Sequence, residues 1–188
     1  MSRAEKFKTL GDLIERDLDV VFVGINPSIY SVERGHYFAR PGNRFWPCLS
    51  RSKLSSEARK SLRVHTLTPE HDRVLLRYGI GFTDLCKRPS AKAIDIPIKG
   101  LAAGVDALLE KLKYFKPRVA CFHGITGYRH VHNLLGDTSS AAKHGFQKLA
   151  LGETRIYLAP NPSGANAHFT REDQVRAYDE ISKWLARG

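Results

Sequence analysis

The sequence predicts a single α/β domain of three layers, in which a parallel sheet lies between two layers of helices. Short apolar runs of strand length recur along the chain, and segments with helical spacing of apolar residues separate them. Strands that alternate with helices pair in parallel, because each helix crosses back over the sheet. The 188 residues contain no internal repeat and no linker that would divide them. We therefore expect residues 1–188 to form one domain with its own hydrophobic core.

Four apolar runs are expected to form the strands of the sheet. The first covers residues 19–24 and ends at a glycine, and two similar runs cover residues 118–122 and 154–159. Residues 79–83 form a weaker fourth candidate. Runs in which neighbouring residues are both apolar are typical of strands buried on both faces, as in parallel sheets. The sequence therefore predicts a four-stranded parallel sheet.

Two helices are indicated by the spacing of their apolar residues and by their ends. Residues 98–115 place apolar side chains on one face, and Pro117 stops this helix before the third strand. Near the C-terminus, Thr170 and Asp173 form the pattern of a capping box, and an apolar stripe follows as far as residue 185. We expect both helices to cover the sheet.

The charge of the chain favours a polyanionic partner. The net charge is +11, and the stretch from Arg34 to Arg63 carries eight basic residues against one acidic residue, Glu57. A basic run on its own is usually a solvated face. Here aromatic residues interleave with the basic ones, which favours nucleic acid over a membrane surface. These aromatic residues are Tyr37, Phe38, Phe45 and Trp46.

The cysteines, the histidines and the N-terminus set further expectations. Three widely spaced cysteines cannot build a four-cysteine iron–sulfur site and indicate reduced, buried thiols. His130 and His132 match no spacing of a metal-ligand set, so we expect neither a metal nor an organic cofactor. Residues 1–10 are too polar for a signal peptide, and no apolar run reaches membrane-spanning length. We expect a soluble intracellular monomer without a membrane partner, in the cytoplasm or nucleoid of a bacterium or the nucleus of a eukaryote.

The loops that follow the strands are expected to hold the functional site, because ligands bind beyond the carboxyl ends of the strands of an open parallel sheet. These loops cover residues 24–31, 83–88, 123–127 and 160–168. The sequence has no phosphate-binding Walker motif and no G-x-S-x-G nucleophile turn, and Gly79-Ile80-Gly81 lacks the third glycine of a dinucleotide site. Nucleotide binding through these motifs is therefore excluded.

Four motifs occur in order along the chain. They are GINPS at residues 24–28, GHYFARPGNRFWP at 35–47, YGIGFTDLCKRPS at 78–90 and APNPSG at 159–164. Together they resemble the mismatch-specific uracil/thymine DNA glycosylase family, in which G-I-N-P-G precedes an H-F-A-x-P-x-N-R-F-W block at the same distance. The resemblance covers nearly the whole chain. It implies a four-stranded parallel sheet between helices, which agrees with the strands expected above.

The resemblance implies roles for individual residues. Asn26 matches the catalytic asparagine that holds the attacking water, and Phe38 matches the aromatic residue that stacks on the flipped base. Ser31 matches the position that crowds the 5-methyl group of thymine. The other positions implied for base binding are Gly24, Ile25, Pro27 and Ser28, and those implied for DNA binding are Arg40, Asn43, Arg44, Asn161, Pro162, Ser163, Gly164, Ala165 and Asn166.

Three departures from the family pattern occur, and two of them concern its loops. Ser28 stands where the family has glycine, and this costs little unless the backbone needs a positive φ. Ala165 stands at the wedge position, which a larger side chain usually fills, and Ala167 stands where a basic residue is frequent. Alanine cannot fill the space that a flipped base vacates. Reading of an opposite guanine is therefore in question, with Asn166 or His168 as alternative wedges.

The third departure is Asp84, which occupies a position where well-known family members have a non-acidic residue. An amide such as Asn26 can position water but cannot accept its proton. An aspartate at the end of the neighbouring strand can act as a general base. The alternative is that Asp84 only caps the turn before Leu85, which is a common role for aspartate.

The expected function is that of a monofunctional DNA glycosylase, which removes uracil or a related damaged pyrimidine from DNA and leaves an abasic site. Its partner is expected to be double-stranded DNA with a uracil or a mismatch, or single-stranded DNA. Two alternatives stay open at this point. One is a lesion-binding module without chemistry, and the other is a glycosylase of the same fold for thymine or hypoxanthine.

Overall fold

The computed structural model describes residues 8–91, 98–134, 142–164, 166 and 168–187. In these residues five strands form one sheet, in the order β2-β1-β3-β5-β4. The strands are β1 (Val20–Gly24), β2 (Ile80–Asp84), β3 (Val119–His123), β4 (Gly145–Leu151) and β5 (Thr154–Ala159). Strand β1 pairs in parallel with β2 and β3, and β3 pairs in parallel with β5. The four predicted strands and their parallel pairing are confirmed.

The predicted strand number was wrong, because β4 adds a fifth, antiparallel strand at the edge of the sheet. Its sequence, GFQKLAL, mixes polar and apolar residues, and most of its residues are only partly buried. An edge strand with one covered side lacks the continuous apolar run that marks a central parallel strand. This explains why the apolar pattern did not predict it.

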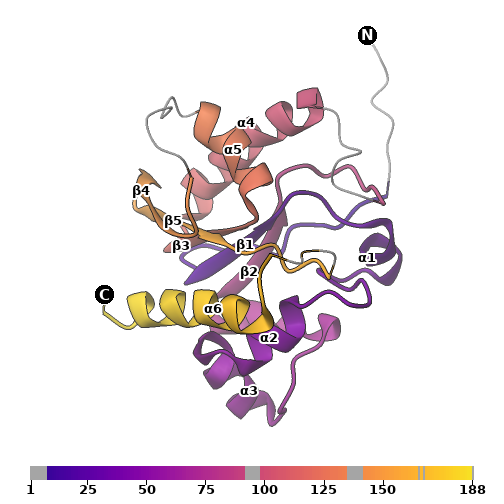
Figure 1. Ribbon diagram of the computed structural model, residues 1–188, viewed down its shortest axis with the longest axis vertical. Helices are drawn as coiled ribbons and strands as arrows, with labels where there is room; N and C mark the ends of the chain where they lie inside the picture. Colours follow the sequence, from indigo (N-terminus) through magenta and orange to yellow (C-terminus); the bar gives the residue numbers. More distant parts are fainter. Residues whose placement is uncertain (1–7, 92–97, 135–141, 165, 167, 188) are drawn as a thin grey trace.

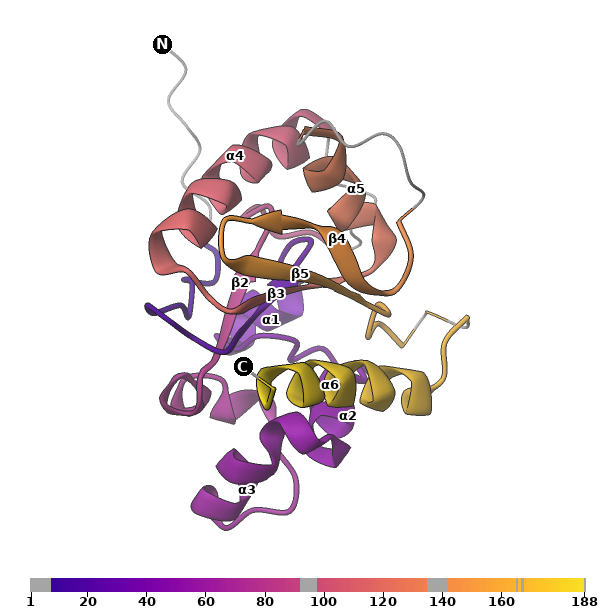
Figure 2. The same ribbon diagram turned by 90° about the vertical axis from the view of Figure 1, so that its left-hand side faces the viewer.

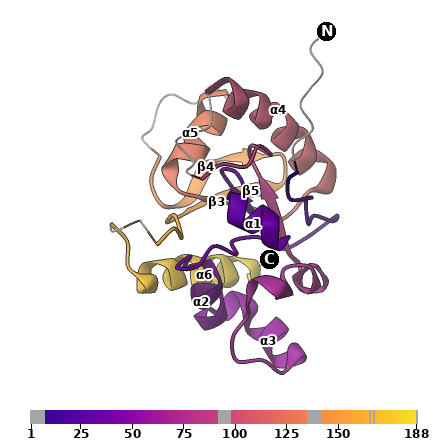
Figure 3. The same cartoon turned by 90° about the vertical axis from the view of Figure 1, so that its right-hand side faces the viewer.

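Helices cover both faces of the sheet, so the predicted three-layer α/β/α architecture is confirmed. Figures 1 and 2 show α4 (Ile98–Phe115) and α5 (Ile125–Leu134) on one face, and α2 (Phe45–Arg51) with α6 (Arg171–Leu185) on the other. Figure 3 shows α1 (Ile29–Arg34) between these layers and α3 (Ser56–Leu62) at the far end of the α2 side. Short 3-10 helices at Lys53–Ser55, Pro69–His71 and Val74–Tyr78 complete the described elements.

Alternate residues of the central strands face the two helical layers. Val20 and Phe22 belong to the core under α2 and α6, while Val21 and Val23 belong to the core under α4 and α5. All four side chains are buried. The strand period of two residues therefore supplies both cores from one apolar run.

The predicted helix ends are confirmed. Helix α4 ends at Phe115, before Pro117. The Thr170 Oγ1 atom accepts a hydrogen bond from the Asp173 amide at 3.1 Å, and the Thr170 amide donates to Asp173 Oδ2 at 2.8 Å. These two bonds form the expected capping box at the start of α6.

The carboxyl ends of four parallel strands meet at one edge of the sheet. Gly24 at the end of β1 is in register with Asp84 at the end of β2, and His123 at the end of β3 is in register with Ala159 at the end of β5. The loops that carry the motifs therefore start side by side. Elsewhere the three cysteines are free and buried, and none of the described helices is long and apolar enough to cross a membrane.

Candidate active site

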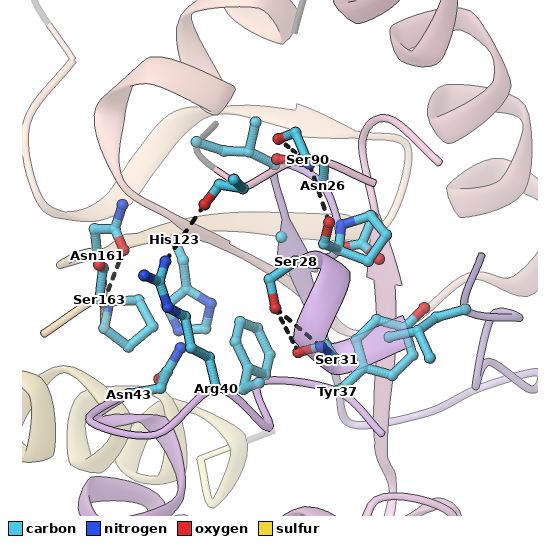
Figure 4. A pocket seen from close by; sticks show the side chains of 18 residues that line it. Asn26, Ser28, Ser31, Tyr37, Arg40, Asn43, Ser90, His123, Asn161 and Ser163 are labelled. Carbon is cyan, nitrogen blue, oxygen red and sulfur yellow. Dashed lines mark hydrogen bonds between the residues drawn. The ribbon is translucent and has the colours of Figure 1, made fainter. Parts of the chain in front are cut away.

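A pocket of about 480 Å³ opens at the carboxyl ends of β1, β2 and β3 (Figure 4). It collects all the residues that the sequence predicted for catalysis and base binding, and several of those predicted for DNA binding. The predicted residues that line it are Gly24, Ile25, Asn26, Pro27, Ser28, Ser31, Phe38, Arg40, Asn43, Asp84, Asn161, Pro162 and Ser163. The lining residues that the sequence did not predict are Leu10, Tyr37, Ser90, Ala91 and His123.

Asn26 follows β1 directly, and its side-chain amide is held in one orientation. Its Nδ2 atom donates to the carbonyl oxygen of Arg88 at 3.1 Å and to Ser90 Oγ at 2.8 Å. It also lies 3.1 Å from the carbonyl oxygen of Pro27. Carbonyl oxygens only accept hydrogen bonds, so the nitrogen must face them. This orientation leaves the amide oxygen Oδ1 as the atom that can accept a hydrogen bond from a water molecule.

Asp84 ends β2 and presents a buried carboxyl group to the pocket, with 5% of the residue exposed. Its Oδ2 atom is buried and has no hydrogen-bond partner among the described residues. Burial raises the pKa of Asp84 to about 7, against the lowering effect of the Lys87 ammonium, and the Asp12 carboxylate adds to the rise. A carboxyl group with such a pKa exchanges protons near neutral pH, which suits a general base. A side-chain oxygen caps a turn by accepting a hydrogen bond from a backbone amide. Because Oδ2 accepts none from the described residues, it does not act as the cap of the turn before Leu85.

Phe38 lines the pocket with its backbone in the left-handed region, at φ 53°. One face of its ring stacks on Phe45, with centroids 4.2 Å apart and planes 18° apart. A left-handed conformation costs a bulky side chain about 1–2 kcal/mol, so the surrounding packing must hold it. Such strain gathers at functional sites. Phe45 and Trp46, two of the aromatic residues of the basic stretch, are buried in the core and not at its surface.

Arg44 holds the loop that follows β5. Its guanidinium donates to the carbonyl oxygens of Phe169 at 2.6 Å and Asn166 at 2.8 Å. Its backbone amide donates to the carbonyl oxygen of Pro162 at 2.8 Å. A Cβ on Gly164 would lie 2.7 Å from the carbonyl oxygen of Gly42, so glycine lets the two motif loops touch. The guanidinium thus positions the predicted DNA-binding loop, while its own contact with phosphate stays a prediction.

The family model of the uracil DNA glycosylase superfamily matches residues 12–186. The chain belongs to this superfamily. Membership gives the chain a DNA glycosylase role in DNA repair, and DNA as its partner.

In this glycosylase Ser28 stands where the mismatch-specific pattern that the sequence resembles has glycine, and it causes no strain there, because its φ is −71°. Its Oγ atom accepts from the Ser31 amide at 3.1 Å and so caps α1. The Ser31 hydroxyl is fixed in turn, with Ser28 Oγ at 3.0 Å and the Ala39 amide donating to it at 3.2 Å. Both hydroxyl groups therefore stabilise the wall of the pocket.

His123 is a pocket residue that the sequence did not reveal. Its Nε2 atom lies 3.0 Å from the Tyr178 hydroxyl, and its ring stands at 81° to that of Phe38 with centroids 5.3 Å apart. Burial lowers the pKa of His123 to about 3, so the ring is neutral. The Nδ1 atom is buried without a partner among the described residues. A histidine after four apolar residues of a strand gives no sequence signal beyond that of a core residue.

The remaining predicted positions divide between the two motif loops and the part outside the described residues. Arg40 is exposed and donates to the carbonyl oxygen of Ala91 at 3.3 Å. Asn43 Oδ1 accepts from the amide of Phe45, the first residue of α2, at 2.8 Å. Asn161 Oδ1 accepts from the Ser163 amide at 2.9 Å, and Asn166 Nδ2 donates to the Asn161 carbonyl oxygen at 3.0 Å.

The predictions at Ala165 and Ala167 lie outside the described residues. Within the described part of the chain, no group of three or more His, Cys, Asp or Glu residues is placed to hold a metal ion.

Substitution of Gly24 tests whether catalysis requires the close approach of the end of β1 to the Asp84 carboxyl group at the end of β2. A Cβ at this position would overlap Asp84 Oδ1. We expect Gly24→Ala to displace the carboxyl group and to slow base release about 10²-fold, the cost of misplacing a catalytic group by an ångström. Single-turnover base release measures the effect. Gly11→Ala is the matched control, because no atom lies within 4 Å of its added Cβ. Release by Gly24→Ala at the wild-type rate would contradict a catalytic need for this carboxyl position.

Proposed function

We propose that this chain is a monofunctional uracil-DNA glycosylase of the mismatch-specific branch, which removes uracil or a related damaged pyrimidine from DNA. One observation carries the proposal. A buried carboxyl group at Asp84 and an oriented amide at Asn26 line the same pocket as the aromatic ring of Phe38. A module that only binds lesions needs the ring but has no use for a buried carboxyl group whose Oδ2 atom has no hydrogen-bond partner among the described residues.

The flipped base stacks on Phe38, which needs only the π-face of the base. Backbone amides near Ile25 and Ser28 stabilise the uracil anion as it leaves, in the manner of an oxyanion hole. Ser31 faces the 5-position of the base and crowds a thymine methyl group. Its hydroxyl is fixed by two hydrogen bonds, which supports this assignment.

The chemistry is hydrolysis of the bond between C1′ of the sugar and N1 of uracil. The bond breaks, and its electron pair leaves with the base. Asn26 Oδ1 holds a water molecule, whose oxygen attacks C1′, and the Asp84 carboxylate takes the proton of that water. The negative charge of Asp84 also stabilises the positive charge that develops on the sugar. The uracil anion then takes up the proton that Asp84 gives back, directly or through solvent, so that the products are free uracil and an abasic site.

DNA is bound by the loops around the mouth of the pocket. The exposed Arg40 and residues 160–164 lie there, and Pro162 and Ser163 line the pocket itself. Some basic side chains of the stretch of residues 34–63 bind other protein groups. Arg51 pairs with Glu172, and Arg59 donates to Ser55 and to the Ser52 carbonyl oxygen. We therefore assign the phosphate contacts first to Arg40 and its neighbours at the pocket.

The proposed reaction leaves no covalent link between protein and DNA. Of the described residues that line the pocket, none is a lysine, which would be the nucleophile of a Schiff base. Borohydride treatment during turnover is therefore expected to trap no protein–DNA adduct. A trapped adduct would contradict the monofunctional assignment.

The proposal predicts that base release depends little on the opposite base. A general base at Asp84 activates water in every DNA context, whereas an enzyme that relies on water positioning alone gains more from a weak mismatch. Uracil opposite guanine, uracil opposite adenine and single-stranded uracil are expected to be cleaved at comparable single-turnover rates. A strict requirement for opposite guanine would contradict this prediction, and release of thymine or hypoxanthine instead of uracil would reassign the substrate.

A further inference from the structure

We propose that Lys87 is a positioning residue that favours the ionised form of the Asp84 carboxylate, and that Asp12 holds the Lys87 ammonium in place for this task. The inference rests on the proposed function, because it assigns a purpose to charged groups behind the pocket. It concerns two residues to which the sequence analysis assigned no role, although Lys87 lies within the third motif. Asp12 comes from the N-terminal segment, and Lys87 comes from the loop that follows β2.

Lys87 is bound on three sides. Its Nζ atom lies 2.5 Å from Asp12 Oδ1 and donates to the Tyr37 hydroxyl at 3.1 Å. The third neighbour is Asp84 Oδ2, at 3.8 Å. This is the Asp84 oxygen that has no hydrogen bond among the described residues. The Lys87 ammonium therefore acts on Asp84 through its charge, and its contacts with Asp12 and Tyr37 hold it in position.

Asp12 is itself fixed by two lysines. Lys111 of α4 lies 2.5 Å from Asp12 Oδ2 and donates to Thr83 Oγ1 at 3.0 Å. Thr83, next to Asp84 in β2, donates to Asp12 Oδ1 at 2.6 Å. Burial raises the pKa of Asp12, but the combined attraction of the Lys87 and Lys111 ammonium groups is the larger effect. The pKa of Asp12 is therefore lowered, and the carboxyl group is ionised.

The N-terminal segment is attached to the catalytic strand at several points. Leu13 and Phe82 of β2 exchange two backbone hydrogen bonds, at 2.9 and 2.7 Å. The Thr9 hydroxyl donates to the Lys87 carbonyl oxygen at 2.5 Å, and the Tyr37 hydroxyl donates to the Gly11 carbonyl oxygen at 3.1 Å. These contacts attach the segment that carries Asp12 to β2 and to the loop that follows it.

The charges of this cluster balance only when Asp84 is ionised. The charged groups that face Asp84 are Lys87 from its own loop, Lys111 from α4 and Asp12 from the N-terminal segment, with Tyr37 as the titratable neighbour. Burial and three nearby carboxylates, Asp84 among them, raise the pKa of Tyr37, so it stays neutral. With Asp84 protonated the two lysines exceed Asp12 by one charge, and with Asp84 ionised the sum is zero. The cluster thus offsets part of the cost of burying the carboxylate.

The test is the pH dependence of single-turnover uracil release for Lys87→Met beside the wild type. An opposite charge at this distance favours the ionised carboxyl group, so its removal is expected to slow release about tenfold near neutral pH. At alkaline pH the rate should return towards that of the wild type, because Asp84 is then ionised without help. Lys87→Arg keeps the charge and should keep the wild-type profile. Lys111→Met is the matched control, since it removes the other lysine of Asp12 but has no ion pair with Asp84, and its shift should be smaller.

A second readout does not depend on activity. In protein labelled with ¹³C at aspartate carboxyl groups, the Asp84 resonance, assigned by its loss in Asp84→Asn, should titrate at higher pH in Lys87→Met than in the wild type. An equal loss of rate at every pH, with an unmoved resonance, would show a merely structural role and overturn the inference. If Lys87→Met is unstable, Lys87→Gln carries the same expectation. Absence of uracil release by the wild type, or full activity of Asp84→Asn, would instead contradict the proposed function.

Discussion

Asp84→Asn is expected to slow uracil release by about 10²–10⁴-fold, the range that a general base contributes. Asparagine keeps the shape of the side chain but cannot accept the proton of the attacking water. Single-turnover release measures the rate, and DNA binding should persist because the pocket keeps its form. Asp19→Asn is the matched control, because Asp19 lies before the amino end of β1 and pairs there with Arg118. Release by Asp84→Asn at the wild-type rate would reduce Asp84 to a structural residue.

The same substitution should change the response to pH. Burial raises the pKa of Asp84 to about 7, so the wild type loses the reactive carboxylate as the pH falls below that value. The residual activity of Asp84→Asn should lack this loss. Stability should respond in the opposite sense, because a folded-state pKa above the ordinary value of 3.8 means that ionisation between these values destabilises the fold. Asp84→Asn is therefore expected to melt higher than the wild type above neutral pH.

Asn26→Ala is expected to slow release about 10²-fold, because the attacking water loses the group that aligns it. The loss should be similar at every pH, since Asn26 does not titrate. Ser90→Ala provides a graded comparison. It removes the hydroxyl that accepts from Asn26 Nδ2 at 2.8 Å but leaves the carbonyl oxygen of Arg88 in place. We expect a smaller loss for this variant, and a larger loss than for Asn26→Ala would contradict the assignment of Asn26.

The sequence predicted the parts of the fold and site that depend on local pattern. Continuous apolar runs predicted the four parallel strands, and the Thr170–Asp173 pair predicted the start of α6. The motif loops predicted Asn26 and Phe38, because short segments with fixed spacing carry them. In the sheet, Asp84 is in register with Gly24. The sequence had predicted only that Asp84 ends a strand next to the loop that carries Asn26.

What the sequence did not predict depends on contacts between distant segments. His123 and Tyr37 line the pocket, but each lies next to apolar residues in the sequence, and this pattern predicts a core residue. Ser90 orients Asn26 across 64 residues of chain. Asp12 and Lys87 meet only because the N-terminal segment pairs with β2 through Leu13 and Phe82. Such pairings follow from tertiary packing, and no local pattern records them.

The most direct test of the proposed chemistry is release of free uracil from a single-stranded oligonucleotide with one uracil, measured under single-turnover conditions with binding measured in parallel. The wild type, Asn26→Ala and Asp84→Asn are compared. We predict that all three bind the oligonucleotide and that only the wild type releases uracil at a substantial rate. Failure of the wild type to release uracil, or release by both variants at its rate, would contradict the assignment of this pocket as a uracil-DNA glycosylase site.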